Sequence, residues 1–270
     1  MQCRHYGGSP YRIAAVHGGP GAPGSAAGLA IRLAAAGTAV LEPLQSVATI
    51  AGQEAELCAT LEAHAQLPCV LVGWSWGAWL SLIVAAKHPE LVRKLILVGS
   101  GPFQEHYTRG MLAARLARLS AEERAEVEKI ELHMADPGTV SREGLFARFG
   151  ELLSRGDTFS ALPSDELPSA EELPVQPEVY AGVWPQAAAM RANGELLALA
   201  TEVRCPVAAI HGDCDPHPAE GVREPLSRVL PDFRFVLLQR CGHEPWIERH
   251  ARVRFFEVLS EILSGDSGTS

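Results

Sequence analysis

A serine between two glycines is the first feature of the sequence that could carry out chemistry. Gly73, Ser75 and Gly77 form a G-x-S-x-G pattern, preceded by an apolar run at 68–74 that predicts a strand and followed by a run that predicts a helix. A sharp strand-to-helix turn lifts such a hydroxyl clear of the sheet, at a backbone cost of about 1–3 kcal/mol. Glycines two positions before and after leave room for the turn. The pattern predicts Ser75 as a nucleophile and the Trp76 backbone N–H as an oxyanion donor.

A glycine-rich loop is the second such feature. The residues His-Gly-Gly-Pro-Gly at 17–21 follow a predicted buried strand at 12–17. Glycines let backbone donors approach a ligand closely, so we expect the Gly19 N–H to be the second oxyanion donor. Gly18 and His17 are expected to shape the loop, with His17 buried and hydrogen-bonded. The loop lacks both common phosphate-binding patterns.

A serine nucleophile also needs a base, and the base needs an orienting acceptor. His243 follows the last predicted strand, 233–239, and is expected in a loop at the carboxyl edge of the sheet. Asp213 and Asp215 compete for the role of acid after the strand predicted at 203–212. We favour Asp215, because it lies beyond the strand end and before a proline-rich turn, where it can reach back to His243. Asp213 is expected to cap the turn.

A metal site is the alternative interpretation of the same segment. Four side chains there could be metal ligands: His211, Asp213, Asp215 and His217. Alternation along a strand and a turn would scatter them, so neither a metal nor an organic cofactor is predicted. His217 is expected to be exposed in a loop, and His250 to lie inside the final helix, 245–264.

These side chains need a scaffold, and the apolar periodicity predicts one. Short apolar runs predict strands at 12–17, 38–43, 68–74, 93–100, 203–212 and 233–239, with those at 12–17 and 203–212 buried. Helical spacing between them predicts helices at 25–36, 49–65 and from the serine turn to about 88. Apolar strands that alternate with helices indicate a mostly parallel sheet of about six strands, covered on both faces.

The middle of the chain has a different pattern. Most of 102–200 is helical and charged, and 161–178 carries four prolines typical of a loop or hinge. We therefore predict an α/β core formed by 1–101 and 201–270, with 102–200 inserted as a helical cap. Trp74, Tyr180 and Trp184 are candidates for lining the pocket beneath it; for the last two, packing in the core is an equal alternative.

Composition excludes several function classes. The chain has 270 residues, 47% of them hydrophobic and 20% charged, which excludes global disorder. With 23 Lys and Arg against 32 Asp and Glu, its net charge of −9 is poorly suited to nucleic acid or an anionic membrane. The uncharged run 69–86 divides into a strand and a helix and is not expected to span a membrane. The first twenty residues contain no signal-peptide core.

The cysteines point to a reducing compartment. Six cysteines without a C-x-x-C pair do not form a disulfide scaffold, so a cytoplasmic location is expected. Cys214 and Cys241 flank the predicted acid and base, which leaves a local redox effect open. The sequence carries no indication of the oligomeric state.

Four stretches together resemble the α/β-hydrolase superfamily: VHGGPG, LVGWSWGAWLSLIVAAKHPELVRKLILVGS, AAIHGDCDPHP and CGHEPW. The resemblance is greatest to the HGGPG-loop group that includes the proline iminopeptidase-like hydrolases. It implies Ser75 as nucleophile, His243 as base, Asp215 as acid, and Gly19 and Trp76 as oxyanion donors. Two departures stand out. Only about ten residues precede the HGGPG strand, which predicts a shortened N-terminal hairpin, and Trp74 replaces a glycine common in the peptidases.

The predicted function is a serine hydrolase that acts on a small ester, thioester or amide through an acyl-enzyme. Three alternatives remain open: a proline iminopeptidase-like aminopeptidase, a lyase or carbon–carbon bond hydrolase with the same triad, and a non-catalytic ligand-binding protein. The peptidases need cap carboxylates to hold a free amine. Such residues are present in the sequence of the predicted cap, for example Glu105 and Glu178.

Overall fold

A computed structural model describes residues 2–135 and 142–265. Within them, seven strands form one sheet in the order β1-β3-β2-β4-β5-β6-β7. Neighbouring strands are parallel except for the antiparallel pair β1 and β3. The strands are β1 (Gln2–Tyr6), β2 (Ile13–Val16), β3 (Val40–Leu44), β4 (Cys69–Trp74), β5 (Val92–Val98), β6 (Val207–Gly212) and β7 (Phe233–Leu238). The mostly parallel sheet confirms the predicted fold class.

The first strand corrects the expected count of six. β1 pairs with β3 from Gln2 opposite Leu44 to Tyr6 opposite Val40, and so adds an edge strand rather than a hairpin with β2. Its residues are half-buried or exposed. An edge strand of this kind lacks the continuous apolar run of a buried strand, which is why the sequence did not indicate it.

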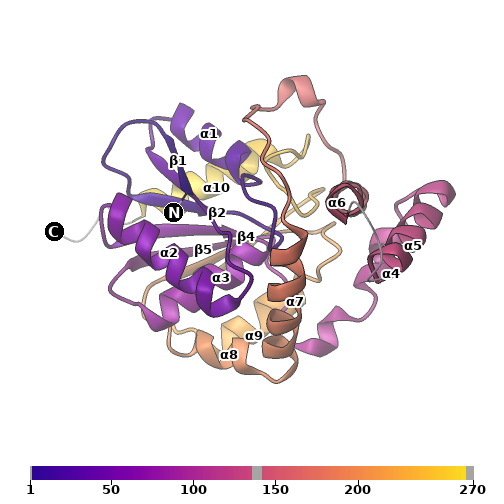
Figure 1. Cartoon of the computed structure of the whole chain (residues 1–270). Coiled ribbons are helices and arrows are strands. Elements are labelled where there is room, and N and C mark those ends of the chain that lie inside the picture. Colours follow the sequence, from indigo (N-terminus) through magenta and orange to yellow (C-terminus); the bar gives the residue numbers. More distant parts are fainter. Residues whose placement is uncertain (1, 136–141, 266–270) are drawn as a thin grey trace.

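Helices cover both faces of the sheet (Figure 1). One apolar core contains residues of α1 (Ala27–Ala35) and α10 (Arg252–Ser264). The other contains residues of α2 (Ile50–His64), α3 (Trp76–Lys87), α8 (Glu195–Ala200) and α9 (Glu220–Val229). α10 begins at Arg252, so His250 precedes it instead of lying inside it. With both faces covered, the loops at the strand ends are the places where polar side chains can gather.

The chain between β5 and β6 is largely helical, as the pattern indicates. It contains η1 (Glu105–Thr108), α4 (Met111–Leu116), α5 (Ala121–Ala135), α6 (Arg142–Asp157), η2 (Ser164–Glu166), α7 (Pro177–Ala192) and α8. α4, α5 and α6 stand away from the sheet (Figure 1) and share a small apolar cluster that includes Val127 and Leu152. α7 lies against the core, where Gly182 approaches the Ala48 carbonyl so closely that a Cβ would clash. Residues 136–141 of the predicted cap lie outside the described part.

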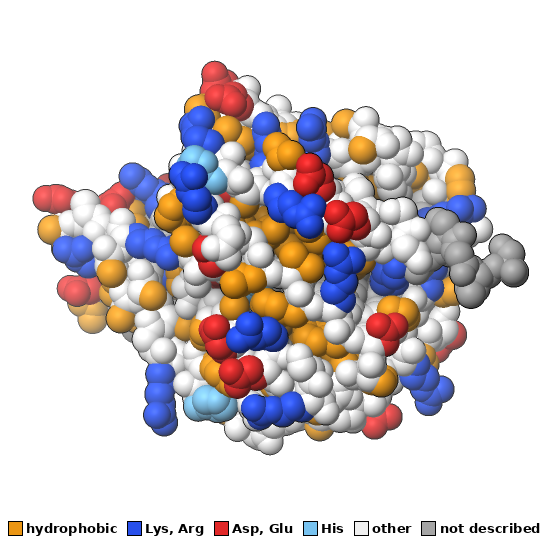
Figure 2. All heavy atoms as spheres, turned by 180° about the vertical axis from the view of Figure 1, so that it is seen from behind, with side chains coloured by type: hydrophobic (Ala, Val, Ile, Leu, Met, Phe, Trp, Pro, Cys, Tyr) orange, Lys and Arg blue, Asp and Glu red, His pale blue; other side chains and the backbone are white. Residues whose placement is uncertain are grey.

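The face seen in Figure 2 carries both signs of charge. Blue Lys and Arg side chains alternate with red Asp and Glu side chains around an apolar area, so this face has no uniformly basic surface. In the described part of the chain, no helix has the length and hydropathy needed to cross a bilayer. The uncharged run 69–86 forms β4 and most of α3 instead.

Candidate active site

Ser75 occupies a strained turn between β4 and α3. Its φ of +54° and ψ of −118° are unusual for a residue other than glycine. A Cβ on Gly73 would lie 2.3 Å from the Gly77 carbonyl oxygen, and one on Gly77 would lie 2.3 Å from the Val16 carbonyl oxygen. Both glycines are therefore required by the close approach of backbone. The turn presents the serine side chain at the carboxyl edge of the central strand.

The loop after β2 packs directly on this turn. A Cβ on Gly18 would lie 2.6 Å from the Trp74 ring and 3.1 Å from the Ser75 Cβ. In the described residues, neither the Gly19 N–H nor the Trp76 N–H donates a hydrogen bond, and Trp76 is the first residue of α3. Both donors are free to bind a ligand oxygen, the second at the positive end of the helix dipole.

His17 supports that loop from below. It is fully buried, its Nδ1 is 2.9 Å from the Gly18 carbonyl oxygen, and its Nε2 accepts a hydrogen bond from the Gln45 N–H at 3.3 Å. These contacts require a neutral ring with the proton on Nδ1. Burial lowers the pKa of His17 to about 4, which keeps the ring neutral. His17 is thus a scaffold residue, remote from proton transfer.

Asp215 and His243 meet at the ends of the neighbouring strands. Asp215 follows β6, His243 follows β7, and His243 Nδ1 lies 2.7 Å from Asp215 Oδ2. Both side chains are buried. Burial acts against the charged imidazolium, but the Asp215 charge and hydrogen bond outweigh it, so the pKa of His243 is raised. For Asp215, burial acts to raise the pKa, and the surrounding imidazoles outweigh it, so the pKa is held well below the usual range.

A second histidine shares the same carboxylate. His217 Nδ1 lies 2.7 Å from Asp215 Oδ1, and its ring stacks on that of His243 with centroids 4.4 Å apart. It is buried, not exposed as the sequence suggested, because its ring packs between Asp215, His243 and Arg115 of α4. The Arg115 guanidinium lies 3.1 Å from His217 Nε2. Burial first, and then the nearby positive charges, lower the pKa of His217 to about 4 despite Asp215.

These contacts separate the two rings chemically. His217 Nε2 faces a guanidinium donor and serves as a hydrogen-bond acceptor, so it is not available to take a proton from a serine. His243 has the raised pKa expected of a base. Among the described residues no hydrogen bond joins Ser75 Oγ to His243, and such bonds are commonly long before substrate binds.

The backbone around His243 is fixed from two sides. Trp74 Nε1 donates to the His243 carbonyl oxygen at 3.0 Å, and the His243 N–H donates to the Asp157 carbonyl oxygen at 3.0 Å. Trp74 also packs edge-on against Trp246, with centroids 5.1 Å apart. The Trp74 side chain therefore positions the loop after β7 that contains His243, called the histidine loop below. Trp74 is not among the residues that line the cavity described below, whereas the sequence suggested a contact with substrate.

A buried carboxylate ties the same loop to the helical segment. Glu248 accepts hydrogen bonds from the N–H groups of Gly242, Phe159 and Ser160 at 2.9, 2.7 and 2.7 Å. Gly242 directly precedes His243, and the other two residues follow α6. These three charge-assisted bonds join the loop that contains His243 to the chain that follows α6.

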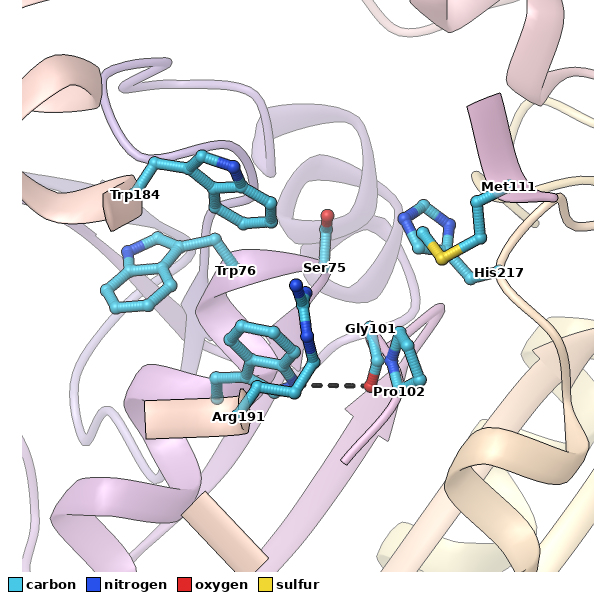
Figure 3. Close-up of a pocket in the computed structure, with 9 residues that line it drawn as sticks. Ser75, Trp76, Gly101, Pro102, Met111, Trp184, Arg191 and His217 are labelled. Carbon is cyan, nitrogen blue, oxygen red and sulfur yellow. Dashed lines mark hydrogen bonds between the residues drawn. The ribbon is translucent and has the colours of Figure 1, made fainter. Parts of the chain in front are cut away.

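A small cavity opens in front of Ser75 (Figure 3). It is lined by Ser75, Trp76, Trp79, Gly101, Pro102, Met111, Trp184, Arg191 and His217. Its free volume is about 20 Å³, which is space for about one water molecule. Trp184 lines the cavity and also packs against the core. Tyr180 does not: its ring lies beside Trp184, with centroids 6.1 Å apart.

The cluster of Asp215, His217 and His243 also has donor atoms close enough to hold a metal ion. Its geometry fits hydrogen bonding better. Each Nδ1 is 2.7 Å from a different carboxylate oxygen, so each ring has a partner for its proton. The Arg115 guanidinium next to His217 adds positive charge that disfavours a cation. His211 bonds the His217 carbonyl oxygen through Nε2, and Asp213 accepts from the Cys241 N–H as a turn cap.

The thiols near the site are protonated. All six cysteines are free. Burial raises the pKa of Cys241 and, to a smaller extent, that of Cys214. Thiols are poor nucleophiles in this state, so a redox role for this pair has no support in the structure.

A model of the alpha/beta hydrolase fold family matches residues 55–249 of the sequence. The chain belongs to this family. The matched region runs from within α2 past His243 and confirms the resemblance to the α/β-hydrolase superfamily; the HGGPG loop at 17–21 lies outside it. The hydrolase also matches curated relatives. The pimeloyl-[acyl-carrier protein] methyl ester esterase of Chromobacterium violaceum is 28% identical over 209 residues, 75% of this chain and 73% of the relative. The protein of the same name from Aromatoleum aromaticum is 31% identical over 201 residues, 70% and 74%.

Solved structures share the fold of this hydrolase over nearly its whole length. The crystal structure of VinJ aligns with a TM-score of 0.63 at 18% identity, covering 97% of this chain and 94% of VinJ. The proline iminopeptidase of Mycobacterium smegmatis aligns with a TM-score of 0.60, also at 18% identity and the same coverage. At these identities the likeness concerns the fold.

Several residues at the site were not found from the sequence. Arg115, Asp157, Arg191 and Glu248 have ordinary spacing, and only the folded chain brings them to the site. His217 lies in the AAIHGDCDPHP stretch, two positions after Asp215, and this short spacing was the one feature of the sequence that could have indicated a contact between them.

Proposed function

We propose that this hydrolase cleaves small carboxylic esters with a Ser75–His243–Asp215 triad. The observation that carries the proposal is the juxtaposition at the carboxyl edge of the sheet. A serine in a strained turn faces a cavity, and a buried Asp–His pair with a 2.7 Å hydrogen bond follows the two strands beyond β5. Strain of this kind is rare where only packing is needed.

In the proposed mechanism His243 Nε2 takes the Ser75 hydroxyl proton while Oγ attacks the ester carbonyl carbon. The carbonyl oxygen becomes an oxyanion and accepts hydrogen bonds from the Gly19 and Trp76 N–H groups. The tetrahedral intermediate collapses, the C–O bond to the alcohol breaks, and His243 protonates the leaving oxygen. Water, deprotonated by His243, then attacks the carbonyl carbon of the acyl-enzyme. The bond from that carbon to Ser75 Oγ breaks, His243 returns the proton to Oγ, and the carboxylic acid is released. Asp215 holds the ring through Nδ1–H and stabilises the imidazolium.

The helical segment 102–200 is proposed to act as the cap of this site. It supplies Met111, Trp184 and Arg191 to the cavity wall. It is also joined to the glycine loop, because the Gln176 N–H donates to the Gly21 carbonyl oxygen at 2.7 Å. The small free volume favours a small leaving alcohol. The relatives named as methyl ester esterases support a methyl ester.

An aminopeptidase function has less support. The nine residues that line the cavity include the cation Arg191 and no Asp or Glu. A free amine would lie near a positive charge with no carboxylate to pair with it. Glu105 is engaged with Arg191 at 2.8 Å. The lining therefore favours a neutral or anionic substrate over an aminoacyl one.

The test combines turnover with active-site labelling. Ser75→Ala should lower kcat/KM for methyl and aryl esters at least about a thousandfold. A serine-directed phosphonate should label the native hydrolase stoichiometrically and fail to label Ser75→Ala. Ser81→Ala is the matched control, because the Ser81 hydroxyl lies in α3 and has no hydrogen-bond partner among the described residues. Near-native turnover in Ser75→Ala would refute the mechanism, and a C–C cleavage product without ester turnover would favour the lyase or C–C hydrolase alternative.

A further inference from the structure

A positive charge stands in the wall of an otherwise largely apolar cavity. The Arg191 side chain comes from α7, is only 10% exposed, and shares the cavity with Trp76, Trp79 and Trp184. Figure 3 shows its guanidinium pointing into the cavity that Ser75 faces. The proposed ester hydrolysis does not use this group.

Two contacts fix the guanidinium and leave its outer edge free. Arg191 Nε donates to Glu105 Oε2 at 2.8 Å, and Cζ lies 5.7 Å from the centre of the Trp79 ring. In the described residues, neither Nη1 nor Nη2 donates a hydrogen bond. The side chain is thus preorganised, with two parallel N–H donors unpaired.

A simpler explanation is that Arg191 is a structural latch, an ion pair with Glu105 that joins α7 to η1. This role accounts for only part of the geometry of the guanidinium. The latch uses Nε alone, and its partner Glu105 has a side chain that is 52% exposed. A purely structural arginine would be expected to turn its terminal nitrogens to solvent or to protein acceptors. Here they are partly desolvated, which strengthens their interaction with an anion.

We infer that Arg191 binds a carboxylate at the far end of the acyl group, so that the preferred substrates are monoesters of dicarboxylic acids. The inference rests on the proposed ester hydrolysis at Ser75. A guanidinium fork matches the two oxygens of a carboxylate. Since the alcohol part of the ester is expected to be small, the carboxylate of the substrate lies on its acyl part. Because Arg191 and Ser75 line one small cavity, we expect the acyl chain between the ester and the carboxylate to be short.

The kinetic test compares esters of similar size and different charge. Monomethyl glutarate should have a kcat/KM about 10- to 100-fold above that of methyl pentanoate, the range expected for a charge-assisted bidentate pair. Arg191→Gln should remove this preference, because it lowers kcat/KM for monomethyl glutarate far more than kcat/KM for methyl pentanoate. Arg191→Lys should keep part of it. Arg228→Gln, a matched loss of charge on the exposed face of α9, should keep all of it. A series from malonate to pimelate monoesters should peak at a short chain.

A binding measurement keeps this inference separate from the catalytic proposal. Calorimetry on Ser75→Ala should detect monomethyl glutarate but not dimethyl glutarate, and the additional Arg191→Gln change should abolish the signal. If native protein hydrolyses neither ester class, the proposed function fails, and Arg191-dependent binding alone decides the inference. Equal kcat/KM for charged and neutral esters at every chain length overturns the inference, as does a preference that survives Arg191→Gln. Equal losses on both ester classes in Arg191→Gln would identify the latch as its role.

Discussion

His217 stacks on His243, with ring centroids 4.4 Å apart and planes inclined by 26°. Each ring points Nδ1 at a different oxygen of Asp215, at 2.7 Å in both cases. Two imidazolium rings in this contact would repel each other, so the pair has room for one positive charge. Arg115 beside His217 assigns that charge to His243. The arrangement makes His217 a positioning residue for the carboxylate.

The first prediction separates the two histidines. His243→Gln should lower kcat/KM at least about a thousandfold, as expected for the loss of a triad base. His217→Gln should lower it only about tenfold, because Asp215 keeps its bond to His243 and loses one of its supports. Steady-state kinetics on one ester measures both. Equal losses in the two variants would assign the base to His217.

The second prediction concerns pH. His243 must be neutral to accept the serine proton, and its pKa is raised above the ordinary 6.5 mainly because the Asp215 charge outweighs burial. The plot of kcat/KM against pH should therefore fall on the acid side through a midpoint above 6.5. Asp215→Asn should move this midpoint to lower pH and reduce kcat by about ten thousandfold. A flat profile from pH 5 to 8 would contradict the assignment.

Local sequence signals were sufficient to predict much of this structure. The strands from β2 to β7 are rich in apolar residues, so this frame was visible without coordinates. The start of α5 is also stabilised by near neighbours in the chain: the Ser120 N–H donates to Glu123 at 2.8 Å, and the Glu123 N–H donates to Ser120 at 3.2 Å. Gly73 and Gly77 could be interpreted because backbone sterics at a tight turn depend on neighbours in the chain.

The remaining features depend on contacts between distant segments. Arg115 and His217 are 102 residues apart, and Glu248 joins the histidine loop to residues 88 and 89 positions away. Burial of His217 follows from such packing, so a loop pattern predicted exposure instead. Arg191 illustrates the same limit. Its spacing in α7 is that of an ordinary helix residue. It becomes part of the cavity only because α7 packs next to the Ser75 turn in the folded chain.

The third prediction tests the contact between the glycine-rich loop at 17–21 and the turn at 73–77 that carries Ser75. A methyl group on Gly18 would overlap the Trp74 ring and press on Ser75, so Gly18→Ala should displace the loop. We expect a loss of about 1–3 kcal/mol in the free energy of unfolding and at least about a tenfold loss in kcat. Gly8→Ala is the matched control, since a Cβ there would meet no atom of the described residues within 4 Å. Urea denaturation and ester turnover measure the two effects, and indistinguishable variants would refute the predicted steric role.

The fourth prediction concerns acid stability and follows from His17. Burial lowers its pKa to about 4 in the folded protein, against an ordinary value of 6.5 once unfolded. Between these values the unfolded chain binds a proton that the folded chain does not, so stability falls as pH drops from about 6.5 to about 4. The full loss from this one group is about 3 kcal/mol. His17→Gln removes the titrating ring, so its urea midpoint should be lower than that of the native protein at pH 7 and fall less steeply toward pH 4.5. If the urea midpoint falls equally steeply with pH in both proteins, the loss of stability in acid does not come from His17.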